Sequence, residues 1–183
     1  MSEVSLTVAT AAQMRALGRA LATVLRAGDL VILSGGLGAG KTTLTQGIGD
    51  GLGVRGPVTS PTFVIARVHP PVTRAAATDG PRPPLVHADA YRLGSVLELD
   101  DLDLDADTAA SVTVVEWGEG LAEGLAADRL EITITPDAAA AGEIGEGDPD
   151  GLGADVPRTV RISAVGERWE GIKFPLLSRA DRL

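Results

Sequence analysis

A glycine-rich segment at residues 35–42 combines residue types that can hold a polyphosphate. Its sequence, GGLGAGKT, satisfies the pattern G-x-x-x-x-G-K-[ST], in which small residues let backbone N–H groups turn inward around phosphate oxygens. Lys41 would place a positive charge on the β and γ phosphates, and the Thr42 hydroxyl would bind Mg²⁺. A chance glycine-rich turn is the alternative, but the strand-like run before it and the helix-like run after it argue against that. The segment therefore predicts a phosphate loop that binds a nucleotide.

Two acidic residues later in the chain directly follow short strand-like runs. They are Asp89 and Glu116. In an open parallel sheet such residues lie at the carboxyl ends of strands, beside a phosphate loop. Phosphoryl transfer needs a carboxylate that holds Mg²⁺ or its waters and a group that orients the attacking water. Both acids are candidates, and the pattern alone leaves open which one binds the metal. The alternative is that each caps a loop or pairs with Arg92 or Arg129.

Two further residues near these segments carry weaker signals. Thr62 follows the helix expected after the phosphate loop, where many P-loop hydrolases use a threonine to sense the γ-phosphate through Mg²⁺. From its position alone, after Ser60 and Pro61, it fits an ordinary turn equally well. His87 could take part in chemistry, although a histidine near a strand end is more often packed or hydrogen-bonded.

The elements that must position these residues alternate between strands and helices. Thr10 and Gln13 have the spacing of a capping box that opens a helix, which Gly28 would end. This alternation predicts a single α/β domain over residues 1–183, P-loop NTPase-like, with a mainly parallel sheet and helices on both faces. Further helices are expected at residues 42–52, from Ser95, and at 120–127, and strands at 30–33, 63–68, 85–88, 112–115, 130–135 and 159–165.

Two segments and the tail interrupt this pattern. Residues 70–84 are rich in Pro, Ala and Thr, and residues 137–157 consist largely of Ala, Gly and acidic residues. Neither has usable hydrophobic periodicity, so both are predicted to be flexible insertions in the one domain. The tail at 179–183 is expected to be frayed.

The overall composition limits the kinds of partner. The chain carries a net charge of −9 and has a pI near 4.6, so stable nucleic-acid binding by the isolated chain is not expected. No apolar run reaches the roughly 18 residues that span a bilayer, and the first residues do not form a basic leader followed by an apolar run. The chain has no cysteine, which fits a reducing compartment. We therefore expect a soluble, cytoplasmic protein that does not bind membranes.

Four segments together resemble the TsaE family, also called YjeE, the ATPase of bacterial tRNA threonylcarbamoyladenosine synthesis. The similarity runs over about residues 10–165. The phosphate loop alone would be generic, and the specific part of the match is the His-x-Asp-x-Tyr-Arg segment with the Glu-Trp pair after it. The segments are GAGKTT at 38–43, SPTF at 60–63, HADAYRL at 87–93 and VEW at 115–117.

The resemblance implies a Mg²⁺-dependent ATPase, slow when isolated, that works with the TsaB and TsaD proteins and meets tRNA only through their complex. It implies that Thr62 is the switch threonine, that Asp89 is needed for hydrolysis and that Glu116 is a Mg²⁺ ligand with Thr42. It places Trp117 beside the nucleotide and makes Thr10 and Arg158 candidate contacts to it. The expected loop contacts are Gly35, Gly38, Ala39, Gly40, Lys41, Thr42 and Thr43.

One departure from the family is Gly36, where an aspartate is usual. We expect a weakened or rearranged loop that still binds phosphate, because the backbone does not need that carboxylate. A P-loop small-molecule kinase is the main rival interpretation, but its lid would need arginines and residues 137–157 are acidic. A GTPase is disfavoured because the sequence has no Asn-Lys-x-Asp segment. A nucleotide-dependent interaction module with incidental hydrolysis is the third possibility.

Overall fold

The structure is a computed structural model that describes residues 2–61, 66–72, 82–91, 108–137 and 156–174. Thr62, Arg92, the helix expected from Ser95, the tail, and most of both expected insertions lie outside the described residues. Seven strands in the described part form one mixed sheet, in the order β1-β7-β6-β2-β5-β4-β3. The elements are β1 Ser2–Val8, α1 Ala11–Ala22, β2 Leu30–Ser34, α2 Lys41–Leu52, β3 Ala66–His69, β4 Leu85–Asp89, β5 Val112–Glu116, η1 Glu123–Leu125, β6 Arg129–Pro136, β7 Arg158–Val165 and η2 Glu167–Trp169.

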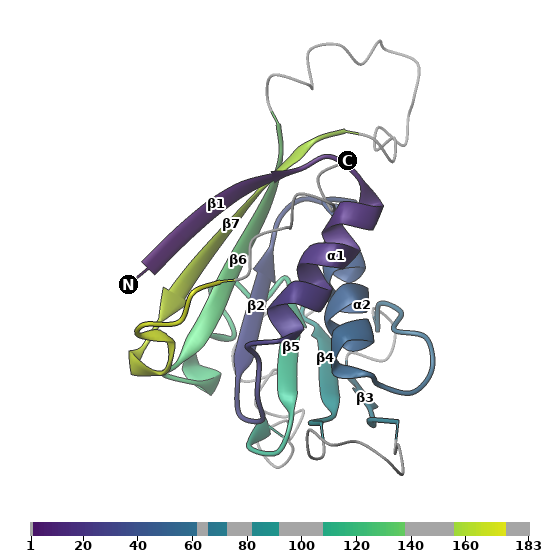
Figure 1. Cartoon of the computed structure of the whole chain (residues 1–183), viewed down its shortest axis with the longest axis vertical. Coiled ribbons are helices and arrows are strands. Elements are labelled where there is room, and N and C mark those ends of the chain that lie inside the picture. The colour runs from purple at the N-terminus through teal and green to yellow at the C-terminus, as the bar shows by residue number, and fades with distance from the viewer. Residues whose placement is uncertain (1, 62–65, 73–81, 92–107, 138–155, 175–183) are drawn as a thin grey trace.

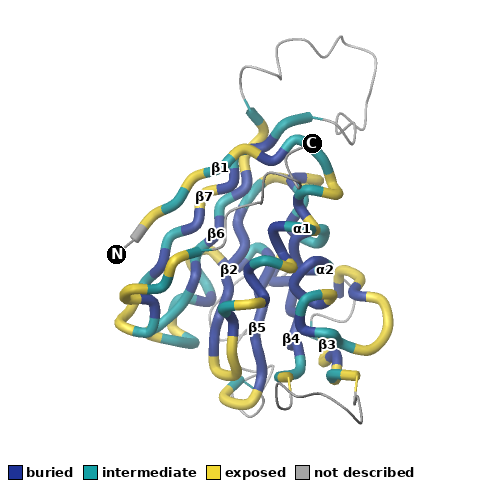
Figure 2. Tube along the Cα trace, viewed as in Figure 1, coloured by how far each residue is buried: buried dark blue, intermediate teal, exposed yellow. Residues whose placement is uncertain are grey.

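The centre of the sheet is parallel and its edges are antiparallel (Figure 1). The strands β4, β5, β2 and β6 run parallel to their neighbours. The strand β3 pairs antiparallel with β4 at one edge, and β7 and then β1 extend the other edge in antiparallel register. The central strands β2, β4 and β5 are buried along their whole length, as parallel strands covered on both faces are (Figure 2). The predicted α/β class with a P-loop NTPase-like arrangement is confirmed.

Both described α-helices cover the same face of the sheet. Their apolar residues share one core cluster with alternate residues of the strands, such as Val31, Leu33 and Val114. The opposite face, with Leu30 and Ile32, packs against residues 118–126. Among the described residues, that second face therefore carries the short 3₁₀ helix η1 and no α-helix, so the predicted helices on both faces are not found in this part of the chain.

The two α-helices approach each other closely because glycines face the contact. A Cβ atom at Gly18 would lie 2.4 Å from the carbonyl oxygen of Leu44, and one at Gly47 would lie 2.3 Å from that of Arg15. Real Cβ atoms do not come so near, so neither position accepts a side chain without movement. The close packing fixes α2, which begins at Lys41, against α1.

The start of α1 follows the predicted capping pattern. The Thr10 hydroxyl accepts a hydrogen bond from the Gln13 N–H at 3.2 Å, and the Gln13 side chain accepts one from the Ala9 N–H at 2.7 Å. The predicted end at Gly28 is wrong. The helix ends at Ala22, since the Thr23 hydroxyl and N–H both bond back to the carbonyl of Ala20.

Two other sequence predictions differ from the structure. The helix expected at residues 120–127 is reduced to η1, because three glycines at 118, 120 and 124 weaken helix formation there. The strand β1 was not predicted, although Val4, Leu6 and Val8 alternate with polar residues as a half-buried strand does. None of the helices in the described ranges has the length and apolar character that a bilayer crossing requires.

Candidate active site

A cavity of about 490 Å³ lies at the carboxyl ends of β2, β4 and β5, where the loop after β2 leads into α2. Three segments that are distant in the sequence meet here, since the parallel strands end at the same edge of the sheet. The residues around it combine small, cationic, acidic and aromatic side chains. They are Leu37, Gly38, Gly40, Lys41, Thr42, Thr43, Ser60, Asp89, Tyr91, Glu116 and Trp117.

The phosphate loop depends on glycines with positive φ. Gly35, Gly38 and Gly40 have φ angles of 144°, 71° and 110°. A Cβ at Gly35 would also lie 2.4 Å from the carbonyl oxygen of Ile134 on β6. Gly40 is the N-cap of α2 and has no side chain to cap it, so the first N–H groups of the helix can bind an anion.

Lys41 is held against the loop that it follows. Its Nζ donates hydrogen bonds of 2.9 Å to the carbonyl oxygens of Gly35 and Gly36, and it lies 3.6 Å from the centroid of the Trp117 ring. Burial lowers the pKa of Lys41 below its usual value, and the carboxylates of Glu116 and Asp89 oppose that shift. The ammonium group therefore lies near two acids that line the same cavity.

Glu116 joins the phosphate loop to the neighbouring strand. Its carboxylate accepts hydrogen bonds from the Thr42 hydroxyl at 2.9 Å to Oε1 and 3.0 Å to Oε2. His87 Nε2 lies 2.7 Å from the same Oε1 atom. Glu116 is only 3% exposed, so these contacts replace the water that an acid needs when it is buried.

Asp89 is the register partner of Glu116 on β4, and it has its own donors. Its Oδ2 accepts from the Ser60 hydroxyl at 3.0 Å, and its Oδ1 accepts from the Tyr91 N–H at 3.0 Å. Both acids are the last residues of their strands, which places them on the cavity as the sequence predicted. Ser60 and Tyr91 were not among the predicted site residues, although both stand within the motifs that carry the resemblance.

Trp117 has an unusual backbone conformation directly after Glu116. Its φ is +60°, a value that non-glycine residues rarely adopt, and its N–H donates to the carbonyl of Leu33 on β2. Its ring contacts that of Tyr91, with 5.0 Å between centroids. The turn aims the indole over Lys41, so Trp117 and the exposed Tyr91 form an aromatic wall of the cavity.

Thr10 and Arg158 are not among the residues that line the cavity. A Cβ at Gly40 would lie 3.3 Å from the Met14 methyl group on α1 and 3.9 Å from Cδ of Arg158. Arg158 is buried and donates to the carbonyl of Val156 at 2.8 Å, while the Thr10 hydroxyl caps α1. Arg158 thus lies beside the loop, neither residue lines the cavity, and a nucleotide contact for either one stays a prediction.

The donor set around Thr42 fits a magnesium ion. The hydroxyl of Thr42 and the carboxylate of Glu116 are hard oxygen donors that already touch each other, as ligands of one ion would. Mg²⁺ usually takes one or two protein ligands and completes its shell with phosphate oxygens and water. No group of three or more His, Cys, Asp or Glu side chains suitable for a metal gathers within the described ranges. Thr42 and Glu116 are therefore the candidate ligands.

Comparison with known proteins connects this site to one family. The family described as threonylcarbamoyl adenosine biosynthesis protein TsaE matches residues 8–144. This chain belongs to the TsaE family. A TsaE protein of Streptomyces coelicolor, named a tRNA threonylcarbamoyladenosine biosynthesis protein, is 59% identical over 157 residues, which cover 85% of this chain and 93% of that protein.

Other TsaE relatives match over similar lengths. The TsaE protein of Bacillus subtilis is 34% identical over 172 residues, covering 93% of this chain and 91% of that protein. The crystal structure of Bacillus subtilis YdiB superposes with a TM-score of 0.63 at 29% identity and covers 92% of this chain. The resemblance stated from the motifs is confirmed, and the family match includes Lys41, Asp89 and Glu116.

Proposed function

We propose that this TsaE-family protein binds ATP with Mg²⁺ and hydrolyses it in support of tRNA N6-threonylcarbamoyladenosine synthesis. The observation that carries the proposal is the contact between the Thr42 hydroxyl and the Glu116 carboxylate. These residues are 74 positions apart in sequence and meet at 2.9 Å. The contact joins the end of a phosphate loop to an acid on a neighbouring strand, which is the arrangement that P-loop hydrolases use.

The phosphates would bind where the loop glycines and the start of α2 present backbone N–H groups. Lys41 would exchange its bonds to the Gly35 and Gly36 carbonyls for bonds to phosphate oxygens, a short movement because those carbonyls belong to the same loop. Thr42 and Glu116 would hold Mg²⁺, which neutralises charge on the β and γ oxygens. The aromatic wall of Trp117 and Tyr91 would limit water at this side of the site.

Asp89 would orient the attacking water. Its two oxygens accept hydrogen bonds from the Ser60 hydroxyl and from the Tyr91 N–H, so the carboxylate is held at the cavity wall. A carboxylate in this position can accept a proton from water as the γ-phosphate departs. The switch role of Thr62 remains a prediction from sequence.

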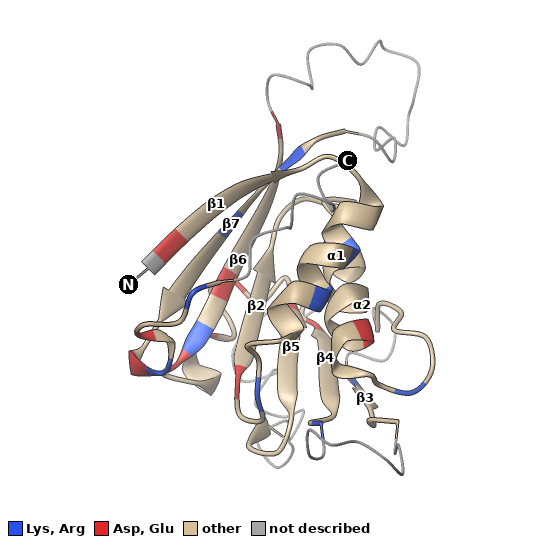
Figure 3. Cartoon of the chain, in the orientation of Figure 1, with Lys and Arg blue, Asp and Glu red and all other residues tan. Residues whose placement is uncertain are grey.

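The proposed partners are TsaB and TsaD, with tRNA reached only through their complex. The relatives are named for tRNA threonylcarbamoyladenosine biosynthesis, which supports a role of this chain in the same process. In the view of Figure 3, Lys and Arg are spread over several elements and interspersed with Asp and Glu. This distribution and the net charge of −9 favour contact with RNA through a partner.

The test is a pull-down of TsaB and TsaD with the purified chain, with and without ATP, followed by measurement of phosphate release. We expect ATP-dependent association and release of inorganic phosphate to water, faster in the mixture than with the chain alone. Failure to associate in either state would overturn the partner assignment. Transfer of the γ-phosphate to an added small molecule in place of water would favour a kinase.

A further inference from the structure

His87 is a buried side chain in contact with the site that the roles above leave without a function. It is fully buried in β4, next to β3 on one side and β5 on the other. Its Nε2 atom lies 2.7 Å from Oε1 of Glu116. Its Nδ1 atom is also buried and has no hydrogen-bond partner in the described part of the chain.

The contact determines where the imidazole carries its proton. A carboxylate only accepts hydrogen bonds, so at 2.7 Å the proton between the two groups belongs on Nε2 of His87. Glu116 thus receives one hydrogen bond from the phosphate loop, through Thr42, and one from β4, through His87. The terminal torsion of a glutamate is intrinsically loose, and two donors from different elements restrict its rotation.

We propose that His87 is a positioning residue that orients the Glu116 carboxylate for the metal ion. The inference rests on the proposed function, because it concerns the acid that would hold Mg²⁺ beside the phosphates. The Thr42 hydroxyl can give a lone pair to the ion and keep its proton on Glu116, and the imidazole holds the same carboxylate from β4. Donors that orient a metal-binding carboxylate typically change metal affinity 10–100-fold when removed.

A packing role predicts a different result, and His69 provides the comparison. It lies on β3, is 3% exposed, and has a buried Nε2 atom without a partner in the described chain. Burial is the main cause that lowers the pKa of His69, with contributions from His87 and Arg67. None of its described contacts involves Glu116. Replacing His69 therefore perturbs the same buried region without removing the donor to the acid.

The experiment compares His87→Gln, His87→Asn and His69→Asn. The amide nitrogen of glutamine can occupy the place of Nε2, whereas that of asparagine reaches only to the place of Nδ1. Calorimetry measures ATP affinity with Mg²⁺ and with EDTA, and phosphate release is measured as a function of Mg²⁺ concentration. Circular dichroism checks that each variant is folded.

We expect His87→Asn to raise the half-saturating Mg²⁺ concentration about 10–100-fold and to leave ATP affinity in EDTA nearly unchanged. His87→Gln and His69→Asn should stay close to the parent in both measurements. A folded His87→Asn variant with the parent's Mg²⁺ dependence would overturn the inference, as would a Gln variant as impaired as the Asn variant. If Mg²⁺ does not strengthen ATP binding by the parent chain itself, the proposed function fails and the role of His87 fails with it.

Discussion

Two buried clusters of charged side chains lie at opposite ends of β2, and they are built differently. At the carboxyl end, Lys41, Asp89 and Glu116 surround a cavity of about 490 Å³. At the amino end, Asp29 directly precedes the strand and pairs with Arg168 from η2. Both clusters are buried, so burial alone does not distinguish a reactive site from a structural one.

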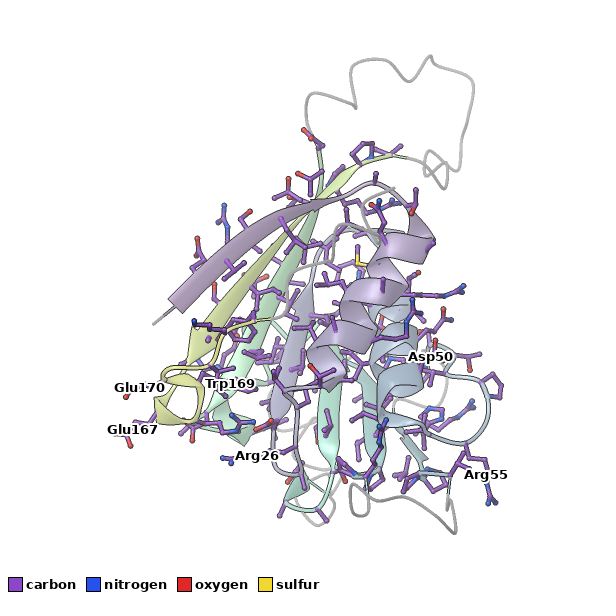
Figure 4. The ribbon with its side chains drawn as sticks, in the orientation of Figure 1. Arg26, Asp50, Arg55, Glu167, Trp169 and Glu170 are labelled. Atoms are coloured by element: carbon purple, nitrogen blue, oxygen red, sulfur yellow. The ribbon has the colours of Figure 1, made fainter. Side chains whose placement is uncertain are left out.

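In the amino-end cluster, the charged groups bond to one another and to nearby backbone groups. Asp29 accepts from Arg168 Nε at 3.1 Å and Nη2 at 3.0 Å and from the Arg26 N–H at 2.8 Å, and Nη2 also donates to the carbonyl of Val24. The guanidinium lies 4.4 Å from the centroid of the Trp169 ring. Figure 4 shows Trp169 against the body of the molecule, with Glu167 and Glu170 pointing away from it.

In the carboxyl-end cluster, the hydrogen bonds of the charged groups can be replaced by bonds to a ligand. Lys41 donates to carbonyl oxygens of its own loop, and the Thr42 hydroxyl donates to Glu116, so all of these bonds can give way to a ligand without unfolding an element. The comparison teaches that the partners of a buried charge indicate its role. The partners of Arg168 are enclosed between separate elements, whereas those of Lys41 lie in its own loop at the border of a cavity and can be exchanged for a ligand.

The largest expected effect is the loss of ATP binding in Lys41→Ala. Removing the ammonium would abolish the charge-assisted hydrogen bonds to phosphate that the proposed function assigns to it, and we expect affinity to fall about 100-fold or more. Calorimetry measures the affinity, and the change in melting temperature should be smaller than that of the Arg168 variant below. An ATP affinity equal to that of the parent would show that the carboxyl-end cluster does not bind phosphate.

Glu116→Gln and Asp89→Asn should separate hydrolysis from binding. Both changes keep the shape of the side chain and remove its charge, so ATP affinity in EDTA should stay within about 3-fold, while turnover falls about 10²–10³-fold. Phosphate release under single-turnover conditions measures the chemical step. Hydrolysis at the parent rate by both variants would contradict the assigned roles.

Arg168→Leu should break the amino-end cluster and leave the site intact. The change leaves the buried Asp29 carboxylate without its cationic partner. We therefore expect a loss of about 3–5 kcal/mol in unfolding free energy, measured by urea denaturation. Turnover per folded molecule should not change. Arg161→Leu is the control, because its pair with Glu3 is more than half exposed and should contribute only about 0–1 kcal/mol. A loss of ATP affinity in Arg168→Leu would mean that the clusters at the two ends of β2 are coupled.

The smallest effects concern two glycines near the phosphate loop. Gly47→Ala places a Cβ 2.3 Å from the Arg15 carbonyl oxygen and should cost about 1–3 kcal/mol in unfolding free energy by forcing α1 and α2 apart. Gly36→Asp restores the residue usual in the family, and its Cβ meets nothing within 4 Å, so stability should change by no more than about 0.5 kcal/mol. Thermal denaturation of both variants tests this expected difference in stability. Equal destabilisation of the two variants would contradict it.

Much of the fold could be predicted from the chain because local patterns agree with it. The capping residues at Thr10 and Gln13, the apolar run of β2, the valine-rich run of β5 and the glycines of the phosphate loop all act over a few residues. The end of α1 could not be predicted, because it depends on the hydroxyl of Thr23, which bonds back to Ala20. The strand β1 was missed although its alternation was visible, and its existence depends on pairing with β7, more than 150 residues later.

The sequence by itself determined the phosphate loop, the family and the two acids at strand ends, because each is encoded by contiguous residues. Tertiary structure decided how they meet: the parallel register of β4, β5 and β2 sets Asp89 beside Glu116, and the contact of α2 with β5 brings Thr42 to Glu116. It also decided that His87 lies against the Glu116 carboxylate, which none of the described contacts of His69 reaches, and that Trp117 turns over Lys41. Such contacts depend on the positions of separate strands in space, which no local pattern of residues records.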